Sequence, residues 1–269
     1  MTHGMASKAF SDDTQVLNDD SSSPLEIDHH IKDYLYKMNH FDDRHQDDLL
    51  LDDQLRYVLK STVGRLKRIE RTVGHGNFYL IDFDQAIKIA RSYTRVGAFQ
   101  SLELDFIEMI FYSDAALYGF SGKKPLSRIT DRIDENRVVS IPYTGNYLYK
   151  GLAEETYRRI KKDIGDDVVL TSGIRGIPKQ LYLFLNKTLR SRGNLSIASR
   201  SLAPPGYSFH GVGDFDVGQI NFGVDNFTER FTSTKVYHQL NDLGYVRLRY
   251  PRENLLGVRF EPWHITLNG

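Results

Sequence analysis

Apolar side chains recur every three or four residues over 55–73, which is the spacing of one face of an amphipathic helix. Gly74 and Gly76 follow this run and predict its end. Two further helices are predicted, one beginning after Asp84 and one over 101–117. The first half of the chain therefore reads as a set of helices, and no sequence motif in it indicates a chemical role.

The pattern changes after about residue 150, where helical periodicity alternates with short apolar runs typical of strands. Proline and glycine at 142–145 predict a turn just before this change. Helices beside a small antiparallel sheet make an α+β fold, which is the class we expect. The predicted helices span 154–164, 178–191 and 228–243, and the predicted strands span 168–172, 197–199, 214–217, 245–249, 258–260 and 263–267.

Three parts of the chain are expected from these patterns. Residues 1–48 are rich in Asp and Ser and poor in apolar side chains, so we predict a disordered acidic leader, with order beginning near Leu49. Residues 49–150 form a helical N-terminal part of unknown role. Residues 151–269 form the α+β domain.

Charge is distributed unevenly along the 269 residues, although the formal net charge is zero. Residues 1–53 carry 13 acidic and 4 basic side chains, which leaves 22 acidic and 31 basic for residues 54–269. A basic body favours anionic partners, although an acidic tail beside an ordinary domain gives the same arithmetic. The basic residues form no aromatic-interleaved patch, so no nucleic-acid partner is expected.

The chain has no cysteine, which excludes disulfides, a thiol nucleophile and every cysteine-bearing zinc site. Any metal must therefore be held by histidines and carboxylates. Of the nine histidines, His29, His30, His40 and His45 lie in or near the Asp-rich leader, where weak metal capture competes with the reading of a solvated linker.

No run reaches the roughly 18 apolar residues that a membrane helix requires, so no membrane span is expected. The N-terminus also lacks the apolar core of a secretory signal. The sequence as it stands therefore predicts a cytoplasmic protein. A periplasmic or envelope location follows instead if the true translation start differs.

Two of the remaining histidines stand near carboxylates in a way that suits zinc. A catalytic zinc site needs three protein ligands, and His210, Asp216 and His264 can supply them without cysteine. Glu261 lies three residues before His264, where a carboxylate can take a proton from a metal-activated water and return it to a leaving amine. The competing interpretation is that each histidine makes a structural hydrogen bond to a nearby aspartate.

Three segments carry a resemblance to a known family, and together they extend it over roughly 150–269. The segment Ser208-Phe209-His210, followed by Gly213 and Asp216, and the segment Glu261-Pro262-Trp263-His264 resemble the two signatures of the VanY-type D-alanyl-D-alanine carboxypeptidases. These zinc peptidases share a Hedgehog-like fold. Upstream, Leu170-Thr171-Ser172-Gly173-Ile174-Arg175 and then Gln180 are similar to the family's Ser-Gly-Tyr-Arg strand and its following glutamine.

The resemblance implies a role for each matching position. His210, Asp216 and His264 would bind Zn²⁺, and Glu261 would be the general base and acid. Arg175 would stabilise the oxyanion of the scissile carbonyl, as a fixed cation does. The residues implied to bind substrate are Ser208, at the terminal carboxylate, and Gln180.

The chain departs from the family pattern at the metal signature. His210 and Asp216 are six positions apart, one fewer than in the family, and Phe215 stands where a small residue is expected. Asp214 is therefore a second candidate ligand, although Asp216 is preferred because the apolar Val217 follows it. Ile174 replaces the family's tyrosine, which changes the expected substrate pocket.

These residues predict a zinc-dependent metallocarboxypeptidase that releases C-terminal D-alanine from peptidoglycan stem peptides. The resemblance leaves two specificities open, a D,D-carboxypeptidase acting on D-Ala-D-Ala ends and an L,D-carboxypeptidase trimming tetrapeptides of muropeptides. The alternative from another class is a non-catalytic zinc-binding module of the same fold that recognises peptidoglycan. Retention of Glu261 and Arg175 favours the enzyme, because a binding module needs neither.

Overall fold

The computed structural model describes residues 33–267, and residues 37–267 lie within one compact unit that contains all the elements discussed below. Residues 1–32 of the predicted leader, with His29 and His30, lie outside the described residues. Residues 33–48 of that leader are described. The Asp48 side chain is almost fully buried and lies 2.6 Å from a guanidinium nitrogen of Arg200. The proposed boundaries of the three parts, at 48 and 150, stay predictions.

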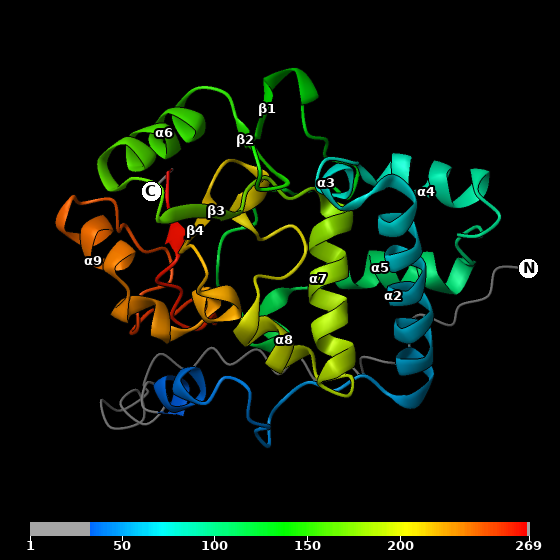
Figure 1. Ribbon diagram of the computed structural model, residues 1–269. Coiled ribbons are helices and arrows are strands. Elements are labelled where there is room, and N and C mark those ends of the chain that lie inside the picture. Colours follow the sequence, from blue (N-terminus) through cyan, green and yellow to red (C-terminus); the bar gives the residue numbers. More distant parts are fainter. Residues whose placement is uncertain (1–32, 268–269) are drawn as a thin grey trace, which may run out of the picture. The chain divides into compact units, whose positions relative to one another are not determined.

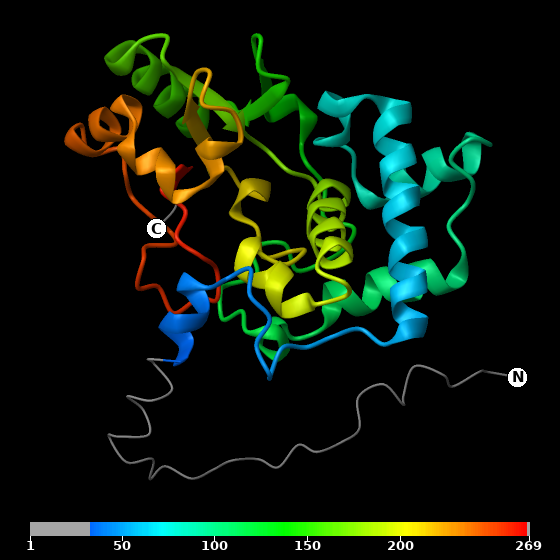
Figure 2. The same ribbon diagram turned by 60° about the horizontal axis from the view of Figure 1, so that its bottom comes forward.

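The predicted amphipathic helix over 55–73 is confirmed as α2 (Asp53–Val73). Its N-cap Asp52 accepts a hydrogen bond from the Leu55 amide, and the chain leaves the helix at Gly74, whose φ of 89° lies in the left-handed region. The buried face of α2 packs against α5 (Ser101–Tyr112) and α7 (Ile177–Arg190). Figures 1 and 2 show α2 alongside α7.

The helix predicted over 101–117 ends earlier, because the chain turns at Ser113 after α5 and re-enters a short 3-10 helix, η1 (Ala115–Tyr118). The helix predicted after Asp84 is α4 (Phe83–Ser92), which begins with a capping box between Asp82 and Gln85. These helices and α7 enclose one hydrophobic core. The remaining named helical elements of this part are α3 (His75–Phe78) and η2 (Glu135–Arg137).

A two-stranded antiparallel sheet follows the helices of the predicted helical N-terminal part, 49–150. It pairs β1 (Val138–Ile141) with β2 (Asn146–Tyr149), two strands that the sequence patterns do not predict. Both strands are rich in β-branched and aromatic side chains, which pack well on a pleated surface. The predicted turn at 142–145 is confirmed, and it contains two left-handed residues, Tyr143 and Gly145.

A three-stranded antiparallel sheet carries the second half of the chain, in the order β3-β4-β5. The strands are β3 (Val168–Ser172), β4 (Phe215–Gln219) and β5 (His264–Ile265). Phe215 and Val217 point into a second hydrophobic core, and Asp216 between them points to the opposite face. The predicted strands over 168–172 and 214–217 are thus confirmed, the second with a shift of one or two residues.

Helices flank this sheet, which confirms the predicted α+β class. The helix α6 (Leu152–Ile164) ends at the left-handed Gly165, as its sequence predicts, and α7 has Pro178 in its first turn. The predicted helix over 228–243 is split by Thr234, whose hydroxyl caps α9 (Lys235–Asp242). The preceding residues form η4 (Gly223–Phe227) and η5 (Glu229–Ser233).

Three predicted strands are wrong. Residues 197–199 lie inside the helix α8 (Leu195–Ser201), because the Asn194 side chain caps the amide of Ile197 and starts a helix there. Residues 245–249 and 258–260 are loops without strand pairing in the structure of residues 33–267. Among those same residues, no helix is long and apolar enough to cross a membrane.

Candidate active site

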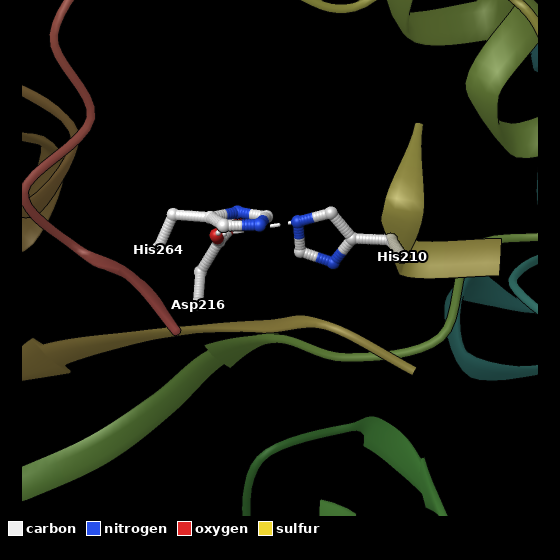
Figure 3. A group of neighbouring side chains, drawn as sticks. All are labelled: His210, Asp216 and His264. Atoms are coloured by element: carbon white, nitrogen blue, oxygen red, sulfur yellow. Dashed lines mark hydrogen bonds and ion pairs between the residues drawn. The ribbon is translucent and has the colours of Figure 1, made fainter. Parts of the chain in front are cut away.

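Sheet pairing brings the three predicted metal ligands together. His264 at the start of β5 lies opposite Asp216 on β4, and His210 comes from η3 (Phe209–Gly211) just before that strand. Figure 3 shows the two imidazole rings and the carboxylate converging from these separate elements. All three are buried, and one ligand atom from each lies within 4.8 Å of the others. In the described part of the chain, this is the one group of side chains that could hold a metal ion.

The orientation of the His210 ring is fixed by a hydrogen bond to the backbone of Gly173. Its Nδ1 lies 2.8 Å from the carbonyl oxygen of Gly173, while its Nε2 lies 3.2 Å from Oδ1 of Asp216. A proton on Nδ1 donated to that carbonyl leaves the Nε2 lone pair as an acceptor, and Nη2 of Arg175 lies 3.0 Å from it. Gly173 is required at this point, because a Cβ there would meet the Tyr147 carbonyl oxygen at 2.0 Å.

Asp214 and Asp216 contact opposite sides of the His264 ring. Oδ1 of Asp216 lies 3.1 Å from Nδ1, and Oδ2 of Asp214 lies 3.0 Å from Nε2. Asp214 also accepts from Nε of Arg249 at 2.9 Å and from the Leu267 amide at 3.0 Å. The structure therefore places Asp216 within the metal group and Asp214 outside it, beyond His264.

A strand irregularity lies opposite Asp216. The register of β3 against β4 shifts between Leu170 and Ser172, whose partners on β4 are Val217 and Asp216. The extra residue, Thr171, is on β3, so it re-aims the side chains that follow it on that strand. Phe215, where the family has a small residue, is fully buried in the core on the other face of the sheet.

The charges of the group are strongly coupled. Burial alone would raise the pKa of Asp216, but His210, His264 and Arg175 together hold it well below the ordinary value for a carboxyl. Burial and the nearby Arg175 lower the pKa of His210, against the opposing effect of Asp216. A neutral His210 and an ionised Asp216 are the forms that bind metals.

The metal group opens into a cavity of about 250 Å³. The predicted site residues Arg175, Ser208 and Glu261 line it together with both histidines and Asp216. Burial raises the pKa of Glu261 to about 7, an effect that is partly offset by His264. A carboxyl group with such a pKa can both accept and return a proton near neutral pH.

Arg175 is held in place by a fork of contacts. Its Nε donates to the Ser172 hydroxyl at 3.0 Å, and its Nη2 donates to Oδ2 of Asp216 at 2.8 Å. Its Nη1 lies 3.5 Å from Oε1 of Gln180, whose amide nitrogen donates to the Ala203 carbonyl at 2.6 Å. Gln180 therefore lies behind Arg175 and is not among the residues that line the cavity.

Several cavity residues were not predicted from the sequence. Tyr79 comes from the helical N-terminal part, Ser172 precedes the Ser-Gly-x-Arg glycine, and Ser201 ends α8. Arg259 lies two residues before Glu261. Of these four, Ser172 belongs to the Ser-Gly-x-Arg motif and Arg259 lies two residues before the Glu-Pro-Trp-His motif, which is the signal that could have identified them. Tyr79 and Ser201 reach the site through tertiary packing that no local pattern encodes.

Comparison with known proteins agrees with the motifs. Residues 150–269 match the family model described as VanY, D-alanyl-D-alanine carboxypeptidase. The chain matches none of the curated proteins.

Solved structures with partial similarity include two of VanY and one of LdcB. One is a variant of the vancomycin-resistance D,D-pentapeptidase VanY from the VanB-type cassette, in complex with Zn(II). It is 22% identical, the match covers 49% of this chain and 78% of that protein, and the TM-score is 0.40. VanYB in complex with D-alanine-D-alanine is 22% identical, with 49% and 77% covered and a TM-score of 0.39. The LdcB LD-carboxypeptidase is 27% identical, with 46% and 60% covered and a TM-score of 0.38.

The family resemblance carried by the His-Gly-Asp and Glu-Pro-Trp-His segments is thereby confirmed for the second half of the chain. Residues 150–269 of this protein, somewhat less than half of the chain, match the VanY family of D-alanyl-D-alanine carboxypeptidases.

Proposed function

We propose that this protein is a zinc-dependent carboxypeptidase that releases C-terminal D-alanine from peptidoglycan stem peptides. The observation that carries the proposal is the buried group of His210, Asp216 and His264, which opens into the same cavity as Glu261 and Arg175 within a VanY-family domain. A metal group, a carboxyl group with a raised pKa and a fixed cation are the parts that metal-assisted peptide hydrolysis needs.

The donor set fits zinc. Two imidazole nitrogens and one carboxylate oxygen, close together and buried, are ligands that Zn²⁺ accepts at catalytic sites, where a fourth position stays open. Outer contacts support two of the three ligands, Gly173 behind His210 and Asp214 behind His264. Zinc bound there supplies Lewis acidity to a water molecule and to the scissile carbonyl.

Glu261 handles the proton in this proposal. With a pKa of about 7, half of its carboxyl groups are ionised near neutral pH and can take a proton from the attacking water. The same carboxyl then returns that proton to the nitrogen of the departing D-alanine, so the proton balance closes within the site. Burial at the cavity wall raises the pKa and thereby makes both steps possible for one side chain.

Arg175 stabilises the negative charge that develops on the carbonyl oxygen. Its guanidinium is held by Ser172, Asp216 and Gln180, so it does not have to reorganise when that charge appears. Gln180 acts here as a positioning residue behind Arg175. Ser208 is buried and lines the cavity, and in this proposal its hydroxyl donates to the terminal carboxylate of the substrate.

Exchange of Glu261 for glutamine tests the proposal. The Glu261→Gln protein should keep its zinc, measured by metal analysis, and should lose at least about a hundredfold in turnover, since general base catalysis typically contributes that much or more. The His264→Ala protein should lose zinc and turnover together. Undiminished turnover in Glu261→Gln, or purified protein without zinc, would contradict the proposal.

The substrate is identified by mass spectrometry of defined stems. Loss of alanine from pentapeptides shows a D,D-carboxypeptidase, and loss from tetrapeptides shows an L,D-carboxypeptidase. Zinc binding combined with stem-peptide binding, but without release of alanine from either stem, would show a recognition module of the same fold instead.

A further inference from the structure

Arg259 is a cavity residue to which the proposed chemistry assigns no role. Its guanidinium carbon lies 5.0 Å from the ring centre of Trp263 and 4.6 Å from that of Phe41. One terminal nitrogen donates to the Phe227 carbonyl at 2.9 Å. These contacts hold the planar cation in a fixed orientation at the edge of the active-site cavity.

Two buried polar atoms on this wall have no partner among residues 33–267. They are Nε of Arg259 and Oγ of Ser201. Ser201 is 5% exposed and also lines the cavity, and the backbone amide of Arg259 donates to the carbonyl of the neighbouring Arg200 at 2.9 Å. Buried donors without partners are rare in folded proteins. Two of them in the lining of one cavity point to a bound group that supplies the acceptor.

We infer that Arg259 and Ser201 bind a carboxylate of the stem peptide. A guanidinium matches a carboxylate with two parallel hydrogen bonds, and a serine hydroxyl can add a third. The other arginine that lines the cavity, Arg175, is already assigned to the scissile carbonyl. The inference rests on the proposed carboxypeptidase function and extends it with a second anion-binding contact. The carboxylate is either the terminal one or that of a side chain earlier in the stem.

The segment before α2 takes part in building this subsite. The Phe41 ring packs against the Arg259 guanidinium. Arg200 holds the segment by donating to the carbonyls of Phe41 and Asp43, at 3.1 and 2.9 Å, and to the Asp48 carboxylate. The segment from Phe41 to Asp48 precedes the part of the chain that matches the VanY family. Substrate selection in this protein therefore depends on residues that the family match does not include.

Three synthetic stems test the inference. Two differ only at the third residue, which is meso-diaminopimelate, with a side-chain carboxylate, or lysine, without one. The third stem ends in D-alaninamide. The proteins compared are the wild type, Arg259→Gln, Ser201→Ala and the control Arg252→Gln, because Arg252 is an exposed arginine that pairs with Glu229 and does not line the cavity.

Arg259→Gln should lower kcat/KM by at least about thirtyfold, the lower bound for removing one partner of a buried charge pair. Loss confined to the diaminopimelate stem identifies the side-chain carboxylate. Equal loss of kcat/KM on the two stems that have a free terminal carboxylate, without loss on the D-alaninamide stem, identifies the terminal carboxylate. Ser201→Ala should show the same pattern with a smaller loss. Unchanged kcat/KM in both variants, or equal loss on all three stems, would overturn the inference.

Measurements of substrate binding distinguish a failure of this inference from a failure of the proposed function. Calorimetry with Glu261→Gln protein, with and without Arg259→Gln, measures the Kd of the same stems whether or not turnover occurs. A Kd raised about thirtyfold by Arg259→Gln for the stems that carry the recognised carboxylate supports the subsite even if no alanine is released. An unchanged Kd overturns it even if the protein proves to be a carboxypeptidase.

Discussion

Nε2 of His264 lies 3.0 Å from Oδ2 of Asp214, a carboxylate that is completely buried. Nδ1 of the same ring faces Asp216 in the metal group. A histidine ligand whose second nitrogen is held by a carboxylate keeps one tautomer and one ring orientation. Asp214 is in turn held by Arg249 at 2.9 Å, so it cannot turn away from the ring.

Loss of the Asp214 carboxylate should therefore weaken metal binding without removing a ligand. We expect Asp214→Ala to reduce the zinc affinity about tenfold to hundredfold, the usual effect of such outer partners. Competition with a chromogenic chelator measures the affinity directly. The matched control is Asp225→Asn, which breaks another aspartate–arginine pair, at 2.9 Å to Arg230, away from the metal group. Equal affinities for Asp214→Ala and wild type would show that Asp214 does not orient His264.

The rise of activity with pH on the acidic side should reflect the ionisation of Glu261. As a base, this residue works only when ionised, and burial raises its pKa to about 7. We therefore expect kcat/KM to rise with pH through about 7, where an ordinary exposed glutamate would give a rise near pH 4.3. Initial rates across a pH series at saturating zinc measure this limb. A plateau that extends down to about pH 5 would rule out Glu261 as the base.

The cation at Arg175 should not be replaceable by lysine. The guanidinium contacts Ser172, Asp216 and Gln180 through three different nitrogens, and a lysine ammonium cannot reproduce this fork. We expect Arg175→Lys to lower kcat by about 10² to 10³, as loss of a preorganised oxyanion donor does, with a smaller change in KM. Steady-state kinetics on the preferred stem separates the two constants. A changed KM with unchanged kcat would show that Arg175 only binds substrate.

The sequence was most informative where short motifs lie on strands. His210, Asp216 and His264 were predicted as one metal group, and antiparallel pairing of β4 with β5 brings the last two face to face. The spacing alone left both Asp214 and Asp216 open. Asp216 faces His210 and His264 because it lies opposite His264 in the pairing of β4 with β5, and strand register depends on the partner strand.

Other features depend on contacts between distant residues. Residues 197–199, predicted as a strand, are helical because the Asn194 side chain caps the helix that contains them. The apolar pattern of these residues favours a strand, whereas the cap favours a helix. The role of Arg259 follows from Phe41, which lies far from it in the sequence and was assigned to the leader. Periodicity describes one element at a time, so it does not show which elements enclose a cavity.

The ion pair between Asp48 and Arg200 should make a large contribution to stability. Both side chains are almost fully buried, and Asn194 also donates to Asp48 at 2.7 Å. Removing one partner of a buried pair leaves the other charge uncompensated, which costs about 3–5 kcal/mol. We expect Asp48→Asn to lower the free energy of unfolding by that amount at neutral pH, measured by urea denaturation. Asp47→Asn is the control, because Asp47 is largely exposed in its pair with Lys37 and should change stability by at most about 1 kcal/mol.

The same pair should also give a characteristic pH dependence. Burial opposes ionisation of Asp48, yet its hydrogen bonds with Arg200, His45 and Asn194 lower the pKa of the folded state below the ordinary value. A lowered folded pKa means that the stabilisation is fully present above the unfolded pKa of about 3.9 and is lost as the pH falls through the folded pKa. The stability difference between wild type and Asp48→Asn should therefore be constant above about pH 5 and shrink in acid. A difference that grows as the pH falls would show that the Asp48 carboxylate does not stabilise this fold through its charge.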